Sequence, residues 1–492
     1  MLRKIRVVVA AITLLLVTLL FLDFTGSLHG WLGWLAKIQL IPAILGIHVG
    51  VIIILALLTL LFGRLYCSVI CPLGLFQDVV ARFGKRGKKM PYSYSKAKSL
   101  LRYIMLAIFI LSIAVGISAI VSLLDPYAAY GRIANNLFQP LWILGNNALA
   151  YVAERVDSYA FYSVDLWIKS AVTFTVAVIT LVVVAVLAWR NGRTYCNTIC
   201  PVGTLLGLIS KFAIFKVRMN DKCNSCGLCA AVCKGACIDA KSKSIDYSRC
   251  VSCFNCVAIC KRDAIGYTAK STPVEAKPTL EATGRREFVS AVALLTAAAA
   301  KAQVLPKNIV AVNMDGGLAE ITEKRNPERA TQITPPGSLS ARNMTGKCTA
   351  CQLCVSACPN GVLRPSNSIN TFMQPEMAFD RGYCRPECTR CSEVCPSGAI
   401  TKIDRAEKSS IQIGHAEWVE SRCLVVKDGV KCNNCQRQCP VQAISMVDMG
   451  HKYPTPIIDT QRCIGCGACE NLCPSRPLSA IYVEGHKNHR TV

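Results

Sequence analysis

Two runs of four cysteines, each spaced C-x2-C-x2-C-x3-C, constrain what this chain can fold into more than any other feature. The eight residues are Cys223, Cys226, Cys229, Cys233, Cys250, Cys253, Cys256 and Cys260. Three thiolates in one tight loop can bind three irons of a cubane, so the fourth ligand must come from elsewhere. The spacing therefore predicts two [4Fe-4S] clusters within residues 216–272.

In proteins with two such clusters, the fourth cysteine of each run binds the other cluster. We therefore expect Cys260 to complete the cluster of the first run and Cys233 to complete that of the second. Two zinc sites are the alternative, but zinc knuckles usually lack a third cysteine after two further residues. Lys234 and Lys261 stand where ferredoxins usually carry proline, which leaves the ligand count unchanged.

Sixteen further cysteines lie between residues 341 and 492, in four motifs that each end in C-x3-C-P. They are Cys348, Cys351, Cys354, Cys358, Cys384, Cys388, Cys391, Cys395, Cys423, Cys432, Cys435, Cys439, Cys463, Cys466, Cys469 and Cys473. Short apolar stretches at 443–447, 456–459 and 480–484 are typical of the hairpins that carry such motifs. We predict four more clusters here, and therefore six [4Fe-4S] clusters in the chain.

Other electron-transfer subunits with four clusters suggest how these ligands are shared. By that analogy, the outer motifs exchange their fourth cysteines, Cys358 and Cys473. The inner motifs exchange Cys395 and Cys439 in the same way. The spacing by itself is compatible with other pairings.

The chain has 492 residues, of which 52% are hydrophobic and 29 are cysteines. It is too long for a small secreted disulfide scaffold, and its apolar content favours a membrane part beside soluble parts. The net charge of +25 would suit nucleic acid, but no nucleic-acid motif occurs. Because an oxidised cluster with four thiolates carries about −2, six clusters reduce the charge to roughly +13. We expect no nucleic-acid partner.

Four apolar stretches, at 7–22, 38–62, 103–124 and 170–189, are long enough with their flanks to cross a membrane. The basic start resembles a signal peptide without a cleavage site, and we interpret it as a retained anchor. Residues 63–99 hold eight Lys or Arg and one acid, whereas 125–165 hold two Arg and four acids. The positive-inside rule therefore predicts a multi-pass protein of the bacterial inner membrane, with the first cluster pair in the cytoplasm.

The sequence repeats itself after the second and fourth apolar stretches. Residues 63–74 and 192–203 both read G-R-x-Y-C-x3-C-P-x-G, which indicates a duplicated two-span unit. If each C-x3-C opens a helical turn, its sulfurs share one face and four thiols converge. These are Cys67, Cys71, Cys196 and Cys200. They suit a redox or metal relay that holds a metal, an additional cluster or a reversible dithiol; the alternative is four structural cysteines at a helix corner.

His48 lies ten residues after the start of the second apolar stretch. Ionisable groups within a membrane are functional candidates, and quinol oxidation needs a proton acceptor. Asp23 and Asp125, near the ends of other stretches, are candidates for the same role. The alternative is a hydrogen-bonded core histidine and two ordinary loop-edge charges. Cys237 matches no motif, and we expect it to be a small buried apolar residue.

Residues 273–340 are rich in Pro, Ala, Thr and charge, which predicts a linker. Within it, Arg285 and Arg286 precede an apolar run that ends at Ala300. This pattern is typical of twin-arginine export signals. If the signal is used, the last region is periplasmic; if the run is an amphipathic linker helix, the last region stays in the cytoplasm.

These features predict four regions. They are a four-helix membrane domain at 1–215, a two-cluster ferredoxin domain at 216–272, the linker at 273–340 and a four-cluster ferredoxin-like domain at 341–492. The predicted fold class is therefore an α-helical membrane domain with four transmembrane helices, plus α+β ferredoxin-like domains.

This order of motifs resembles the accessory ferredoxins of periplasmic nitrate reduction, NapH followed by NapG, in one chain. Residues 1 to about 272 resemble NapH, with four spans, two C-x3-C-P motifs and a two-cluster ferredoxin. Residues from about 280 resemble NapG, with a twin-arginine signal and four clusters, although the signal is internal here. The resemblance implies a quinol dehydrogenase unit that passes electrons from the membrane quinone pool to a periplasmic or membrane cytochrome or reductase.

We therefore expect a membrane-bound iron–sulfur electron-transfer protein, with quinol as substrate and His48 as proton acceptor. An alternative is a metal-reducing or redox-sensing assembly factor that uses the C-x3-C-P thiols. Nitrous-oxide reductase maturation regulators and a copper-reducing oxidase assembly factor share that motif. No glycine-rich nucleotide fingerprint follows a strand, so flavin or nicotinamide chemistry is not expected.

Overall fold

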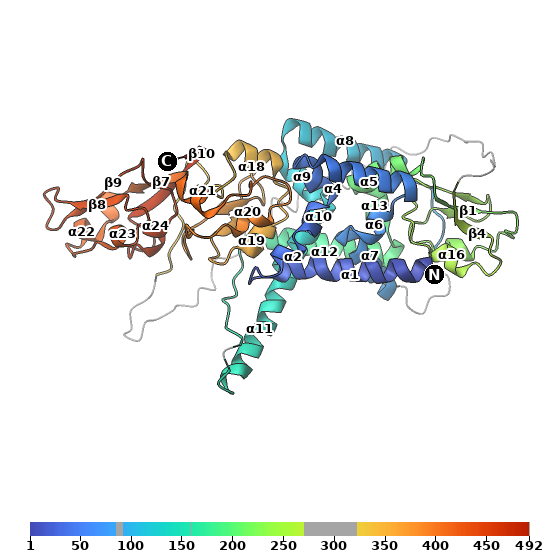
Figure 1. Ribbon diagram of the computed structural model, residues 1–492, viewed down its shortest axis with the longest axis horizontal. Coiled ribbons are helices and arrows are strands. Elements are labelled where there is room, and N and C mark those ends of the chain that lie inside the picture. Colours follow the sequence, from blue (N-terminus) through green and yellow to red (C-terminus); the bar gives the residue numbers. More distant parts are fainter. Residues whose placement is uncertain (85–91, 159, 270–321, 492) are drawn as a thin grey trace. The chain divides into compact units, whose positions relative to one another are not determined.

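The computed structural model describes residues 1–84, 92–158, 160–269 and 322–491 (Figure 1). Contacts divide the chain into one unit of residues 1–270 and 325–492 and a second unit of residues 271–324. The helical part and both cysteine-rich parts belong to the first unit. Arg285, Arg286 and the apolar run to Ala300 lie outside the described residues.

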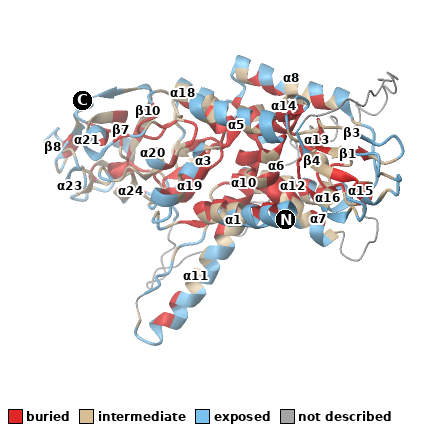
Figure 2. Cartoon of the chain, turned by 45° about the vertical axis from the view of Figure 1, so that its right-hand side comes forward, coloured by how far each residue is buried: buried red, intermediate tan, exposed pale blue. Residues whose placement is uncertain are grey.

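Among the described residues, two helices are long and apolar enough to cross a membrane by length and composition, α1 (Leu2–Leu22) and α12 (Ala171–Asn191). They correspond to the first and fourth predicted spans. The exposed side chains of the long helices are mostly apolar, although burial is concentrated inside the helical part (Figure 2). Exposed apolar residues include Ile12, Leu15, Ile53, Ile54, Leu57, Ile110, Leu111, Ile179, Val182, Val183 and Val186.

The second and third predicted spans are each interrupted. Residues 38–62 form α4 and α5, separated by Ile47 at φ 53°, and 103–124 fall in α8 and α9, separated by Gly116 at φ 84°. A residue in the left-handed region ends an α-helix, so one continuous helix cannot pass through either position. The four helices are α4 (Leu40–Leu45), α5 (Val49–Phe62), α8 (Ser99–Val115) and α9 (Ser118–Leu124).

The interior of the helical part is formed by α10 (Pro126–Ile133) and the π-helical segment η1 (Ala134–Phe138). All residues of α10 are buried. Asp125 caps the helix by accepting hydrogen bonds from the N–H groups of Tyr127 and Ala128, at 3.1 and 3.2 Å. Proline at the first helical position needs no partner for a missing N–H, so this end of α10 can be buried without loss.

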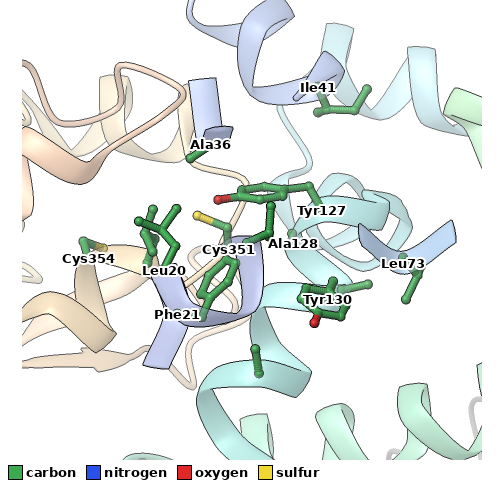
Figure 3. Packing of buried hydrophobic residues seen from close by; sticks show 14 of the residues in the cluster. Leu20, Phe21, Ala36, Ile41, Leu73, Tyr127, Ala128, Tyr130, Cys351 and Cys354 are labelled. Carbon is green, nitrogen blue, oxygen red and sulfur yellow. The ribbon is translucent and has the colours of Figure 1, made fainter. Parts of the chain in front are cut away.

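The aromatic ring of Phe21 in α1 packs on α10. Its centroid lies 5.7 Å from the ring of Tyr127 and 6.4 Å from that of Tyr130 (Figure 3). This contact joins the end of α1 to the buried interior. The remaining helices of this part are α2 (His29–Leu32), α3 (Trp34–Lys37) and α11 (Gln139–Glu154).

The sequence repeat is also a structural repeat. Each copy is a five-residue helix followed by a helix that starts at proline: α6 (Leu65–Val69) with α7 (Pro72–Gly84), and α13 (Thr194–Thr198) with α14 (Pro201–Ser210). Proline has a fixed φ and no N–H, so it begins a new helix instead of continuing the previous one. The two cysteines of each motif therefore flank a helix junction, and the expected single helical turn is wrong.

Residues 216–269 contain two antiparallel strand pairs, β1 with β4 and β2 with β3, and two short helices that contact each other. This is the α+β arrangement expected for a two-cluster domain. The elements are β1 (Lys216–Met219), α15 (Leu228–Ala231), β2 (Ile238–Asp239), β3 (Ser244–Ile245), α16 (Asn255–Ile259) and β4 (Ile265–Thr268).

The second cysteine-rich part pairs β5 with β6, β8 with β9, and β7 with β10, all antiparallel. The predicted strands at 443–447, 456–459 and 480–484 are confirmed as β8, β9 and the start of β10. The long strand β7 was not predicted. The strands are β5 (Leu363–Pro365), β6 (Pro375–Met377), β7 (Ile411–Trp418), β8 (Ile444–Val447), β9 (Thr455–Ile458) and β10 (Ile481–Thr491).

Short helices connect these strands, and residues before 341 also pack on them. Arg329 donates to Glu470 at 2.5 Å, and the N–H of Arg325 donates to the carbonyl of Pro477 at 2.8 Å. The helices are α18 (Ala341–Lys347), α19 (Leu353–Ala357), α20 (Arg390–Val394), α21 (Arg405–Ser410), η2 (Glu420–Arg422), α22 (Leu424–Lys427), α23 (Asn434–Arg437) and α24 (Ala468–Leu472).

Replacing Gly203 with alanine should destabilise the helical repeat. A Cβ there would lie 2.1 Å from the carbonyl oxygen of Cys196, and overpacking of this kind costs on the order of 1–3 kcal/mol. We expect a lower unfolding midpoint for the purified protein in detergent, measured by scanning fluorimetry. Gly145→Ala in α11 is the matched control, because a Cβ there meets nothing within 4 Å. Equal midpoints for the two variants would contradict the close approach of Gly203 to the carbonyl of Cys196.

Candidate metal centres

The eight cysteines of residues 216–269 line two cavities. A cavity of about 190 Å³ is lined by Cys223, Cys226, Cys229 and Cys260. The other is lined by Cys233, Cys237, Cys250, Cys253 and Cys256. Each cavity takes three thiols from one run and one from the other, so the structure brings together both expected ligand sets. It also adds Cys237, which the sequence left without a role.

The sixteen cysteines of the second cysteine-rich part group by neighbouring motifs. One cavity is lined by Cys358, Cys384, Cys388 and Cys391, and another by Cys423, Cys432, Cys435 and Cys473. Cys354 lies near Cys348, Cys351 and Cys395, and also near Cys391 of the adjacent set, and Cys439 lies near Cys463 in the last set. Each of the four sets therefore contains three cysteines of one motif and the last cysteine of a neighbouring motif.

This grouping corrects the expected exchange of ligands. Cys358 and Cys395 are exchanged between the first two motifs, and Cys439 and Cys473 between the last two. The reason is local: α19 contacts α20 and α23 contacts α24, just as α15 contacts α16 in the two-cluster domain. The two motifs of each consecutive pair therefore supply each other's fourth cysteine. The N–H of Cys384 donates to the carbonyl of Cys466 at 2.9 Å and joins the two pairs.

The donor sets fit [4Fe-4S] clusters. Backbone N–H groups donate to the closing cysteines, from Ala264 to Cys260 Sγ at 3.3 Å and from Ala443 to Cys439 Sγ at 3.2 Å. Such bonds to sulfur tune iron–sulfur clusters. The described residues include no group of three His, Cys, Asp or Glu side chains placed around a single metal ion. In a cubane, each thiolate binds a different iron, so the sulfurs do not need to meet at one point.

Burial raises the pKa of the Cys354 thiol well above its usual range, and the neighbouring thiols of Cys348 and Cys351 raise it further. The pKa of Cys469 is raised for the same two reasons, with Cys466 and Cys463 as its neighbours. These groups would stay protonated near neutral pH in the absence of a cation. Bound iron supplies the positive charge that makes four buried thiolates favourable.

The four C-x3-C-P thiols lie near one another in the helical part, and each cysteine is 3% exposed. The two copies of the repeat interlock. Arg64 of the first copy donates to the carbonyl of Cys196 at 3.2 Å, and Arg193 of the second donates to that of Cys67 at 2.5 Å. The arrangement is therefore pseudo-symmetric, with each arginine bound to the other copy.

Hydrogen-bond donors face the sulfurs of this centre. Gln77 Nε2 lies 3.2 Å from Cys196 Sγ, Arg64 Nη2 lies 3.8 Å from Cys67 Sγ, and Gly203 N lies 3.4 Å from Cys200 Sγ. The last contact resembles those of the cluster ligands. The centre can therefore hold sulfur in its anionic form.

The charges around the C-x3-C-P centre are mainly positive. Asp78 forms ion pairs with Arg193 at 2.8 Å, with Lys234 at 3.2 Å and with Arg6. The fourth cation, Arg64, is fully buried, and its described oxygen acceptors are uncharged: Asn197 Oδ1 at 2.8 Å and the carbonyls of Ser248 at 3.0 Å and Cys196. Because buried charges need counter-charges, Arg64 would offset part of the cost of holding anionic sulfur at this centre.

Near its N-terminal end, α1 is linked to the first cysteine-rich part through Asp78, and at its other end it contacts α19 of the second part. Arg6, near its N-terminal end, bonds Asp78, which also bonds Lys234 of the first part. At the other end, Phe21 belongs to the same packed cluster as Cys351 of the second part (Figure 3).

The two cysteine-rich parts also contact opposite ends of α12, which runs in the direction opposite to α1. At its start, Ser170 Oγ donates to Asn367 Oδ1 of the second part at 2.9 Å. Just after its end, the N–H of Arg193 donates to the carbonyl of Lys234 of the first part at 2.9 Å. The two cysteine-rich parts are therefore separated by the length of these helices.

The first motif of the second part sits directly on α10 and η1. A Cβ at Gly131 would lie 2.4 Å from the carbonyl oxygen of Cys351. Asn135 and Asn136 donate to Gln352 Oε1 at 3.2 and 2.9 Å. A glycine at this position thus allows the cluster-binding loop to approach the buried helix.

The three predicted proton acceptors lie on different elements, and the described hydrogen bonds connect none of them to another. His48 is the N-cap residue of α5 and is partly exposed, so it lies at the break in the second predicted span and not inside a continuous helix. Asp23 closes the turn after α1, because it accepts from His29 Nδ1 at 2.9 Å and from the N–H of Gly26 at 2.8 Å. Asp125 is 1% exposed and caps α10.

Family models for iron–sulfur domains match most of the cysteine-bearing segments. A 4Fe-4S binding domain matches residues 43–91 and 173–220, which hold both C-x3-C-P motifs of the helical part. A 4Fe-4S dicluster domain matches residues 347–424 and 430–476, and another matches residues 246–362.

The chain is similar to several ferredoxin-type proteins. It is 30% identical to the methylamine utilization ferredoxin-type protein MauM of Paracoccus denitrificans over 39% of this chain and 85% of that protein. It is 28% identical to the ferredoxin-type protein NapF of Escherichia coli over 36% of this chain and 100% of that protein. It is 23% identical to the putative electron transport protein YccM of E. coli over 43% of this chain and 55% of that protein. No solved structure matches the chain.

The exchange of ligands between neighbouring motifs can be tested with pairs of cysteine substitutions. Cys435→Ser with Cys473→Ser should remove one cluster, or about four irons, because both residues serve the same set. Cys351→Ser with Cys473→Ser should remove two clusters. Iron and acid-labile sulfide are measured on anaerobically purified protein. The reverse result, with two clusters lost in the first variant and one in the second, would support exchange between the outer motifs.

Proposed function

The chain belongs to the ferredoxin-type 4Fe-4S proteins, and we propose that it transfers electrons across a membrane between its two sets of clusters. The observation that carries this proposal is that the two cysteine-rich parts contact opposite ends of α12, while α1 contacts the second part and is linked to the first through Asp78. Helix α12 has 21 residues, so at 1.5 Å per residue it is about 30 Å long, the thickness of the hydrocarbon layer.

The exposed surface of the helices supports a membrane location. The most apolar windows of α1 and α12 are only 28% and 22% buried, whereas the core helix of a soluble protein is mostly buried. Large exposed apolar surfaces are costly in water and favourable in lipid. We propose that α5 and α8, each extended by a short helix beyond its break, complete a four-span domain with residues 63–99 in the cytoplasm.

A continuous packed region connects the two sets of clusters inside this domain. Cys253 of the first cysteine-rich part, Cys71 and Cys200 of the repeat, Tyr127 of α10 and Cys351 of the second part all belong to it. We propose that the four C-x3-C-P thiolates hold an additional iron–sulfur cluster between the two ends, a proposal that the family match over 43–91 and 173–220 supports. Bound clusters would supply single-electron transfer.

Quinol is the proposed electron donor, and a cytochrome or reductase the proposed acceptor. The resemblance to NapH and NapG supports both, and the names of MauM, NapF and YccM indicate ferredoxin-type or electron-transport proteins. His48, at the exposed start of α5, is the proposed proton acceptor, because it can exchange protons with water. Arg285 and Arg286 are the proposed export signal for the four-cluster domain.

Removing the central thiols should interrupt electron transfer without removing the other clusters. Cys67→Ser with Cys196→Ser should lower the iron content by about four and abolish transfer of electrons from a quinol analogue to the four-cluster domain. The measurement is the decrease in cluster absorbance when the quinol analogue is added to detergent-solubilised protein. Ser68→Ala is the control, because Ser68 is a buried neighbour without a thiol. If quinol never reduces a cluster in the unmodified protein, the alternative of a metal-reducing or sensing factor gains support.

The proposed topology can be tested by protease accessibility. A cleavage site inserted in the turn at 240–243 should be cut only after lysis, whereas a site added after Val492 should be cut in spheroplasts. Cleavage products are detected with terminal epitope tags. If both sites need lysis, the two cysteine-rich parts do not lie on opposite sides of the membrane.

A further inference from the structure

Cys237 is a fifth thiol in the cavity that is lined by Cys233, Cys250, Cys253 and Cys256. We call this cavity the inner cluster site. Cys237 is 2% exposed, its Sγ lies 3.4 Å from Cys233 Sγ, and it also forms a side-chain hydrogen bond with Cys250. Its thiol therefore points at two ligand sulfurs and not merely into the apolar core.

The sequence shows that folding does not require a thiol at this position. Cys233 is followed by Lys-Gly-Ala-Cys237-Ile, and its twin Cys260 is followed by Lys-Arg-Asp-Ala264-Ile. Ala443 occupies the same position after Cys439. Alanine at this position leaves the backbone bond to the closing cysteine intact, as the bond from Ala264 N to Cys260 Sγ shows. The thiol of Cys237 is thus an addition to a motif that is complete without it.

We propose that the Cys237 thiol donates hydrogen bonds to the ligand sulfurs of Cys233 and Cys250, and so raises the reduction potential of the inner cluster. Cys237 is a positioning residue, because it acts through the ligands and does not bind iron. Reduction adds negative charge that spreads onto the sulfurs, so a donor stabilises the reduced cluster more than the oxidised one. A thiol is a weak donor, but it is at its strongest against an anionic sulfur in a dry site. This inference rests on the cluster assignment of the proposed function.

The surroundings explain why the inner cluster needs an additional donor. Its ligand Cys253 is buried and shares the packed core with Cys71 and Cys200 of the repeat, whereas Cys226 of the twin site is exposed. Burial disfavours the additional negative charge of the reduced state. Without a compensating donor, the inner cluster would be harder to reduce than its twin. It would then be a barrier between the twin and the C-x3-C-P centre.

The spacing of the motif separates this role from that of a ligand. Cys233 stands four residues after Cys229, like the closing cysteine of each other run, whereas Cys237 stands eight residues after Cys229. If Cys237 were the ligand instead, the inner cluster would depend on it for its iron. Iron content therefore distinguishes a ligand from a donor.

The test is a redox titration of the full protein with dithionite and mediators, followed by electron paramagnetic resonance. Cys237→Ala should keep the full iron content and move one midpoint to a more negative potential, with the others unchanged. Cys237→Ser retains a hydroxyl donor and should move that midpoint by less. Ala264→Cys installs the thiol in the twin site and should move the twin's midpoint to a more positive potential.

Two results would overturn the inference. A loss of about four irons in Cys237→Ala would make Cys237 a ligand, and unchanged midpoints in both Cys237→Ala and Ala264→Cys would make it a space-filling residue. No quinol or membrane is needed in this titration. A failure of quinol to reduce the clusters would therefore count against the proposed function and leave the inference about Cys237 intact.

Discussion

A cubane needs four thiolates, and a single tight loop supplies three; this requirement organises both cysteine-rich parts. The fourth sulfur of each set must come from outside the loop, and the nearest cysteine available belongs to the neighbouring motif. Short helices therefore pair in the order α15 with α16, α19 with α20 and α23 with α24. Three similar modules of eight ligand cysteines each result, one toward one end of α1 and two toward the other.

The helical part solves a related problem with symmetry. Its two C-x3-C-P motifs lie far apart in the sequence, and what brings them together is the exchange of Arg64 and Arg193 between the copies. Each guanidinium reaches the partner copy's cysteine carbonyl across a glycine, Gly74 or Gly203. A longer side chain at either glycine would block the contact. The residues that the two copies of the repeat share therefore build one interlocked structure with two similar halves.

Much of this arrangement can be predicted from spacing, because ligand geometry is local. The two ligand sets of residues 216–269 and the hairpin strands near Ile444 and Ile481 follow from motif and alternation alone. The sharing of Cys358 and Cys473 could not be predicted, because it depends on which loops fold against each other. The breaks at Ile47 and Gly116 were missed for a similar reason: hydropathy measures apolar length and is insensitive to one left-handed residue. Those breaks also explain why His48 caps a helix instead of lying within one.

The electrostatics of the helical part argue for a path that negative charge can cross. Its largest fully buried side chains are arginines, namely Arg64, Arg132 and Arg193. Arg132 donates to the carbonyl of Ser122 at 2.8 Å, while its Nε and Nη2 have no hydrogen-bond partner among the described residues. Burying a guanidinium in a medium of low dielectric constant costs several kcal/mol unless negative charge lies nearby. Arg64 and Arg193 flank the C-x3-C-P thiols, and Arg132 belongs to the helix on which the Cys351 loop rests. Because Arg193 is already paired with Asp78, and Asp125 lies near Arg132, Arg64 is the buried cation whose charge anionic sulfur at the C-x3-C-P centre would balance.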